Sequence, residues 1–131
     1  MSAVALSADP SGKMAVMTLC GALGTKDVDA AVGLLCRSAH CRPGVGIIWD
    51  LQRAEIDMTP REVITTVRYL AHRPGARGSR HAVVAARDLD YGLARAAQAY
   101  AEAWLEAEFM VFRDRGDAER WLEEASGKPL G

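Results

Sequence analysis

The chain has 131 residues, of which 50% are apolar and 25% are charged, and its formal net charge is -1. This length and composition are typical of one globular domain, so we expect a single domain over residues 1–131. A net charge so close to zero argues against binding to nucleic acid or to an anionic membrane surface. No apolar run is long enough to span a bilayer, and no secretory signal opens the chain, so we expect a cytoplasmic protein.

Three cysteines suit a reducing compartment. The stretch CRSAHC places His40 between Cys36 and Cys41, which resembles a set of metal ligands. A closed zinc site needs about four ligands, and the chain has no second pair of this kind. We therefore predict no metal site and no cofactor.

Periodicity and turn residues predict elements in the order ββαβαβαβα. The strands are expected at residues 4–6, 14–19, 45–49, 82–86 and 108–112. The helices are expected at residues 27–36, 60–72, 91–105 and 117–125.

A hairpin followed by repeated strand–helix units predicts an α/β fold. We expect a five-stranded mixed sheet, mostly parallel, with four helices packed on it. Binding sites in such sheets collect beyond the carboxyl ends of the parallel strands. Residues 50–59, 87–91 and 113–116 are expected at that edge.

The junction before the helix at 60–72 has the pattern of a helix start. Thr59 suits the N-cap, Pro60 the first helical position, and Glu62 completes a capping box three residues after Thr59. This structural role accounts for all three residues. The alternative is a regulatory role, because a helix N-terminus attracts anions and a phosphate on Thr59 could be held by Arg53 and Arg61.

Four acids, Asp50, Asp57, Asp88 and Asp90, are expected near the same edge of the sheet. Paired carboxylates could perform acid–base chemistry or hold a cation. Arginines are expected at that edge too, and mutual neutralisation is the simpler interpretation. We predict no catalytic residues and no enzymatic activity.

The helix at 91–105 is rich in alanine and carries Tyr91, Tyr100 and Trp104. Close internal packing of one face explains most of this pattern. The alternative is a surface with aromatic anchors, suited to a protein partner, to a second subunit in a homodimer, or to an apolar ligand pocket lined by these three residues.

The segments IIWDLQRAEI, YGLARAAQAYAE and MVFRDRGDAERWLE follow one another over the C-terminal two-thirds of the chain. In this order they resemble the SpoIIAA-like, or STAS/SEC14, branch of the STAS superfamily. The resemblance implies the fold described above, without enzymatic activity. In anti-sigma-factor antagonists of this superfamily a partner kinase phosphorylates a serine at the start of the helix after the central strand. Thr59 falls at that position and Asp57 matches the preceding acid, whereas Met58 and Pro60 depart from the pattern.

The sequence thus favours a non-enzymatic regulatory or protein-interaction module. Its contact patch would comprise Arg53, Asp57, Thr59 and Arg61, and its partner would be a protein such as a kinase-like or anti-sigma-type regulator. The alternative is a carrier of a small apolar, lipid-like ligand under the long helix, which the resemblance also permits because lipid-carrying domains share this fold.

Overall fold

The computed structural model describes residues 2–8, 11–73 and 78–127, with side chains described up to residue 124. Within these ranges the strands are β1 (Ala3–Ala8), β2 (Met14–Leu23), β3 (Gly46–Ile56), β4 (Arg80–Val84) and β5 (Phe109–Phe112). The helices are α1 (Thr25–Cys36), α2 (Pro60–Ala71), α3 (Asp88–Leu105) and α4 (Arg115–Gly127). The predicted fold class and the predicted element order are both confirmed.

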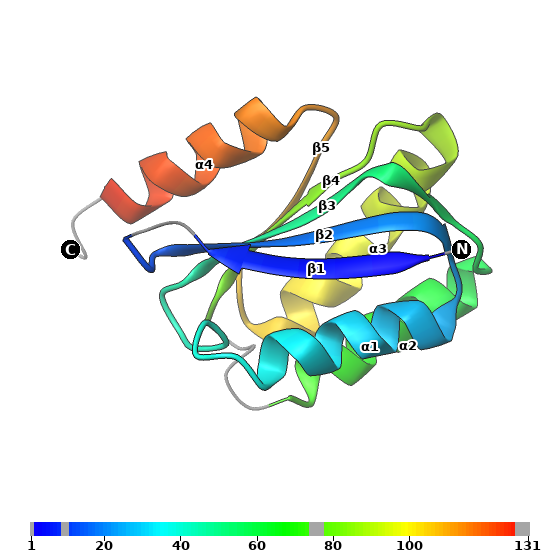
Figure 1. The fold of residues 1–131 in the computed structure, drawn as a ribbon, viewed down its shortest axis with the longest axis horizontal. Helices are drawn as coiled ribbons and strands as arrows, with labels where there is room; N and C mark the ends of the chain where they lie inside the picture. The colour runs from blue at the N-terminus through cyan, green and yellow to red at the C-terminus, as the bar shows by residue number, and fades with distance from the viewer. Residues whose placement is uncertain (1, 9–10, 74–77, 128–131) are drawn as a thin grey trace.

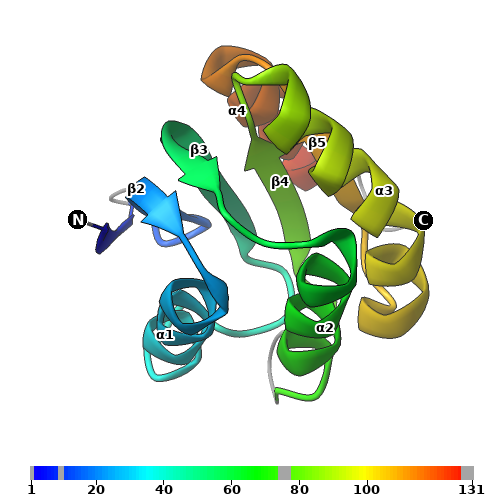
Figure 2. The same cartoon turned by 90° about the vertical axis from the view of Figure 1, so that its right-hand side faces the viewer.

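The sheet has the order β1-β2-β3-β4-β5. β1 and β2 form an antiparallel hairpin, and every later pair is parallel. Each crossover moves one strand in the same direction, so right-handed connections place all three crossover helices on one face. Figures 1 and 2 show this arrangement, with α1, α2 and α3 on one face of the sheet and α4 on the other.

Strand β3 is much longer than the sequence predicts. It continues past Asp50 to Ile56 as a ribbon with β2, whereas its pairing with β4 stops at Asp50. The register shifts after Asp50, whose Oδ1 accepts a hydrogen bond from the Gln52 amide at 3.0 Å. This β-bulge bends the strand and satisfies the amide that the bulge would leave unpaired. Asp50, expected in an exit loop, is instead a buried residue within the strand.

Two apolar cores lie on the two faces of the sheet. The larger one packs between the sheet and α1, α2 and α3, and includes Met17, Ile47 and Leu105. The smaller one lies under α4, where Ala118 and Leu122 contact Ile48 and Val84. Because strand side chains alternate between faces, β3 contributes Ile47 to one core and Ile48 to the other.

A buried polar contact sits within the larger core. The Nε1 of Trp49 donates a hydrogen bond to Nδ1 of His81 at 3.1 Å, and the His81 ring stacks between Trp49 and Phe109 with centroid distances of 6.3 Å. His81 has no exposed surface. The sequence predicts this strand at residues 82–86, which leaves His81 just before it, but His81 lies inside β4 because β3 and β5 pair on both sides of it.

We expect His81→Leu to destabilise the fold by about 1–3 kcal/mol, because the buried indole N–H of Trp49 would lose its acceptor. Denaturant unfolding of His81→Leu, Trp49→Phe and the double variant measures this. The double variant should lose less stability than the sum of the two single variants. Strict additivity would show that the hydrogen bond contributes nothing.

Candidate functional site

The start of α2 is a complete capping box. The Oγ1 of Thr59 accepts a hydrogen bond from the Glu62 amide at 3.2 Å, and Oε1 of Glu62 accepts one from the Thr59 amide at 3.1 Å. Pro60 follows as the first helical residue. The capping role that the sequence predicts for these residues is confirmed, and Thr59 is exposed.

The same glutamate joins the two neighbouring helix starts. Its second oxygen, Oε2, accepts a hydrogen bond from the Thr25 hydroxyl at 3.0 Å, and Thr25 opens α1. The backbone amide of Thr59, then its hydroxyl and that of Thr25, lower the pKa of Glu62 below its ordinary value. An ionised Glu62 therefore holds the N-termini of α1 and α2 together.

Three of the four predicted patch residues lie together at the start of α2. We call Asp57, Thr59 and Arg61 the α2 rim; all three are exposed. The charged groups of Asp57 and Arg61 bind no other residue in the part of the chain that the structure describes. Arg53 is also exposed, but it lies on the opposite face of β3, since its neighbour Ala54 belongs to the core under α1, α2 and α3.

Three arginine–carboxylate pairs lie near this end of the sheet. The nitrogen–oxygen distances are 3.4 Å for Arg115–Asp50, 2.6 Å for Arg113–Asp88 and 3.7 Å for Arg87–Asp90. Asp90 is fully buried, and its Oδ1 accepts a hydrogen bond from the Ile56 amide at 3.0 Å, which anchors the end of β3. Asp50, Asp88 and Asp90 are thus each held in a separate contact with an arginine, whereas the Asp57 carboxylate has no such contact among the described residues.

No group of three or more His, Cys, Asp or Glu side chains that could hold a metal ion occurs among the described residues. Cys36 and Cys41 do approach each other, with their sulfur atoms 3.5 Å apart. Burial, followed by the contact with Cys36, raises the pKa of the Cys41 thiol to about 12. A thiol this resistant to ionisation is a poor metal ligand and a poor nucleophile.

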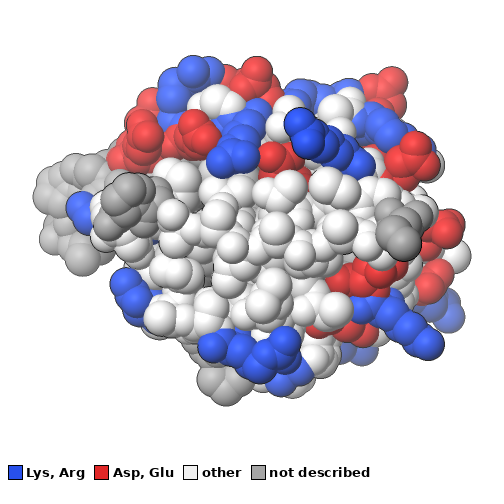
Figure 3. Space-filling view, in the orientation of Figure 1, with Lys and Arg blue, Asp and Glu red and all other residues white. Residues whose placement is uncertain are grey.

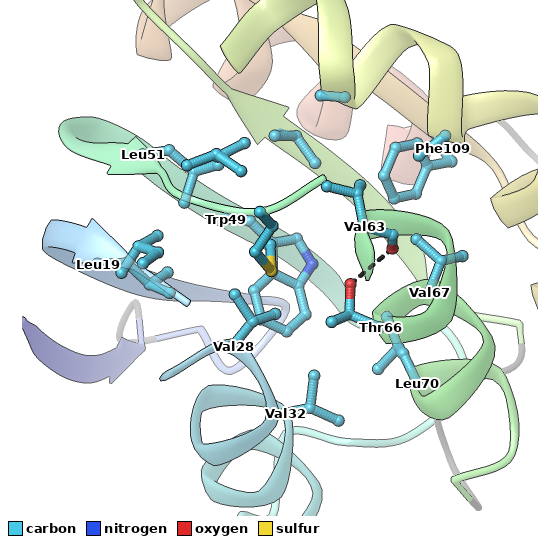
Figure 4. Close-up of a pocket in the computed structure, with 16 residues that line it drawn as sticks. Leu19, Val28, Val32, Trp49, Leu51, Val63, Thr66, Val67, Leu70 and Phe109 are labelled. Carbon is cyan, nitrogen blue, oxygen red and sulfur yellow. Dashed lines mark hydrogen bonds between the residues drawn. The ribbon is translucent and has the colours of Figure 1, made fainter. Parts of the chain in front are cut away.

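An apolar cavity of about 100 Å³ lies between the sheet and the helices α1 and α2. Figure 4 shows side chains from β2, α1, β3 and α2 pointing into it. Its lining consists of Leu19, Leu23, Val28, Val32, Trp49, Leu51, Ile56, Met58, Val63, Thr66, Val67, Leu70, Val83, Ala94, Ala97 and Phe109. Met58 lies between two residues of the α2 rim, so one segment serves both features.

The cavity wall offers no free polar group. The Thr66 hydroxyl donates to the carbonyl of Val63 at 2.7 Å, as Figure 4 shows, and the Trp49 indole nitrogen donates to His81. Apolar cavities of this order of size stay dry and take up small apolar molecules. None of the residues that line the cavity carries a charge. The cavity therefore suits an uncharged apolar group.

The structure places the predicted pocket residues elsewhere. Tyr91, Tyr100 and Trp104 do not line the cavity, and α3 contributes only Ala94 and Ala97 to it. The ring centroids of Tyr100 and Trp104 are 5.2 Å apart. The guanidinium group of Arg68 lies over the Trp104 ring, and that of Arg113 lies over the Tyr91 ring. Ala94, Ala97 and Ala101 are buried against the core, which agrees with the packing interpretation for that face of α3, whereas Ala96, Ala99 and Ala103 are exposed.

Sequence reasoning found the rim but missed the cavity. Val28, Val32, Val63 and Val67 follow ordinary helical spacing, and nothing in that spacing distinguishes a cavity wall from a filled core. One local signal was available. Met58 is a single apolar residue between the polar residues Asp57 and Thr59, and an apolar side chain in such a loop requires an apolar contact.

The fold has a solved counterpart. No protein-family model matches the chain, and neither does any curated protein. An uncharacterized protein of the DUF3478 family from Shewanella loihica PV-4, with a SpoIIAA-like fold, superposes with a TM-score of 0.60 at 18% sequence identity, covering 92% of this chain and 93% of that one. The chain therefore has a SpoIIAA-like fold, as the sequence resemblance implies. None of the helices in the described part of the chain could cross a membrane.

Protonation of Glu62 should weaken the fold. Because the pKa of Glu62 is lowered by folding, its contribution is fully present above the ordinary value of 4.5 and is lost as the pH falls through the lowered value. The unfolding free energy of the wild type should therefore fall as the pH drops below about 4.5, and this fall should be smaller in Glu62→Gln, which has no carboxylate to protonate at this position. The control Glu124→Gln, on the exposed surface of α4, should leave the profile as in the wild type. Identical profiles for all three proteins would contradict the proposed role.

Proposed function

We propose that this chain is a non-enzymatic, SpoIIAA-like interaction module that contacts a protein partner through the α2 rim. The supporting observation is the contrast in charge pairing at this end of the sheet. Asp57 and Arg61 have no internal partner among the described residues, whereas Asp50, Asp88 and Asp90 are each held by an arginine. Unpaired charges on a rigid helix start are available to a partner and can direct its approach.

Thr59 is the residue through which such a contact would be regulated. A phosphate on its hydroxyl would carry about -1.5 to -2 charges. That charge would lie beside the carboxylate of Glu62, whose Oε1 is 3.1 Å from the Thr59 amide. Repulsion would drive Glu62 out of the capping box and away from Thr25, while Arg61 would be available to the phosphate. A kinase-like or anti-sigma-type regulator, as the resemblance implies, is the proposed partner class.

The experiment compares affinity-tagged wild type with Thr59→Glu, Thr59→Ser and Arg61→Glu in quantitative pull-downs from the source cells. Proteins that bind through the rim should be lost with Thr59→Glu and Arg61→Glu, because both variants change rim charge, and retained with Thr59→Ser. Arg95→Glu is the matched control, since Arg95 is exposed on α3. Equal recovery with all variants would count against the rim.

The apolar cavity supports a second candidate function, the binding of a small uncharged apolar ligand. Its wall is formed by apolar side chains from both α1 and α2, and its polar atoms are already hydrogen-bonded. A ligand of this class would gain roughly 25 cal/mol for each Å² of apolar surface removed from water. The lining supplies no cation to pair with a carboxylate, which disfavours fatty-acid anions.

Binding of 1-hexanol should change the fluorescence of Trp49, which lines the cavity, and binding of hexanoate should be much weaker. Titrations use a Trp104→Phe/Trp121→Phe background so that Trp49 is the reporter. Val28→Phe, which fills the cavity from α1, should weaken 1-hexanol binding by about tenfold or more. Ile64→Phe, on α2 but outside the cavity lining, should not. Native mass spectrometry of the gently isolated protein identifies any ligand carried from the cell, and equal binding by both variants would exclude the cavity as the site.

A further inference from the structure

Strand β1 is an uncharged edge of the sheet. It is the terminal strand, and its sequence AVALSA contains no charged residue, proline or glycine over six positions. Figure 3 shows the corresponding band of uncharged surface across the molecule, with charged side chains above and below it. The opposite edge, β5, has only four residues and lies between the charged residues Glu108 and Arg113.

An edge strand of this kind presents unused backbone donors and acceptors. The outer amides and carbonyls of β1 face no other strand within the described chain. Edge strands are normally protected by charge, proline, a bulge or a covering element. α4 packs on β3, β4 and β5, and α1 packs on the inner face of β1 and β2, so neither covers the outer edge. Another extended strand, paired with β1, would supply hydrogen-bond partners for these backbone groups.

We propose that β1 pairs with β1 of a second copy of this chain, antiparallel about a two-fold axis, so that one sheet continues through both copies. Charge distribution supports this occupant. Asp27 of α1 lies near the N-terminal end of β1, where the Ser2 hydroxyl donates to its Oδ1 at 2.5 Å, and Arg53 lies two strands away in the same register, so this end holds charges of both signs. Lys13 and Arg42 lie at the opposite end of β1, where Nη2 of Arg42 is 3.4 Å from the Gly12 carbonyl oxygen.

Antiparallel pairing keeps the two basic ends, which carry Lys13 and Arg42, apart from each other. An uncharged strand between the two ends adds no repulsion, and the same surface serves both partners as two-fold symmetry requires. A parallel arrangement would instead place the two basic ends together. The charge pattern therefore selects the antiparallel arrangement.

The position of α1 fits the same arrangement. α1 contacts β1 and β2 alike, so it lies beneath the boundary between them. With strands about 4.8 Å apart, a two-fold axis half a spacing beyond β1 would place the two α1 helices about 10 Å apart, close to the usual helix-packing distance. Asp27 and Leu34 lie on the same side of α1, and Asp27 faces β1 through Ser2. The half-buried Leu34 of each copy would be covered by the partner.

The test is sedimentation equilibrium of the full chain from low to high micromolar concentration. Wild type should form a dimer. Ala5→Lys places a charge in the middle of exposed β1, and should raise the dimer dissociation constant at least about tenfold. Ala99→Lys makes the same change on an exposed position of α3 and should leave the constant unchanged. Circular dichroism establishes that each variant is folded.

A monomeric wild type over the whole range, or a dimer that Ala5→Lys leaves intact, would overturn the proposal. If Ala5→Lys fails to fold, hydrogen exchange of the wild type decides instead. The amides of Ala3–Ala8 should become more protected as the concentration rises, and protection independent of concentration would refute the pairing. The rim lies outside β1, so failure of this proposal leaves the proposed rim contact untouched.

Discussion

The sequential order of the strands in the sheet, together with right-handed crossovers, is the constraint on which the other features depend. Each strand is added next to its predecessor, and each parallel crossover is right-handed, so α1, α2 and α3 share one face and α4 follows alone on the other. This order leaves β1 as an open edge and sets α1 beside α2. The cavity between these helices and the exposed β1 are therefore both consequences of one topological choice.

The junction between β3 and α2 combines local and tertiary requirements. Thr59 and Glu62 form a capping box, while the second oxygen of Glu62 reaches Thr25 in α1. Met58 turns into the apolar cavity while its neighbours Asp57 and Thr59 remain exposed. The proposed partner contact and the proposed ligand cavity thus share one short segment. A change in the packing of Met58 would therefore shift its neighbours Asp57 and Thr59 in the α2 rim.

Some of the acidic side chains near this end of the sheet are paired with arginines and stabilise the fold, whereas others are exposed to a partner. Asp90 is buried and anchors the end of β3, and Asp50 stabilises the bulge that lets β3 extend beyond β4. Both carboxylates face an arginine, as burial of charge requires. Asp50 and Asp90 therefore stabilise separate parts of the fold, whereas Asp57 and Arg61 of the α2 rim are exposed and have no charged partner among the described residues.

The sequence by itself determined the class of fold, the element order and the capping box at Thr59, because hydrophobic periodicity and helix capping act over a few neighbouring residues. Only the tertiary structure decided where β3 ends, that His81 is buried against Trp49, that Arg53 lies apart from the α2 rim, and that the cavity is lined by Val28 and Val63 rather than by Tyr100. Each of these depends on residues distant in the chain. Strand pairing carries β3 to Ile56, neighbouring strands enclose His81, and a bulge together with side-chain alternation sets the face of Arg53. Local patterns do not encode which apolar residues will meet across two elements, or whether they will fill the space between them.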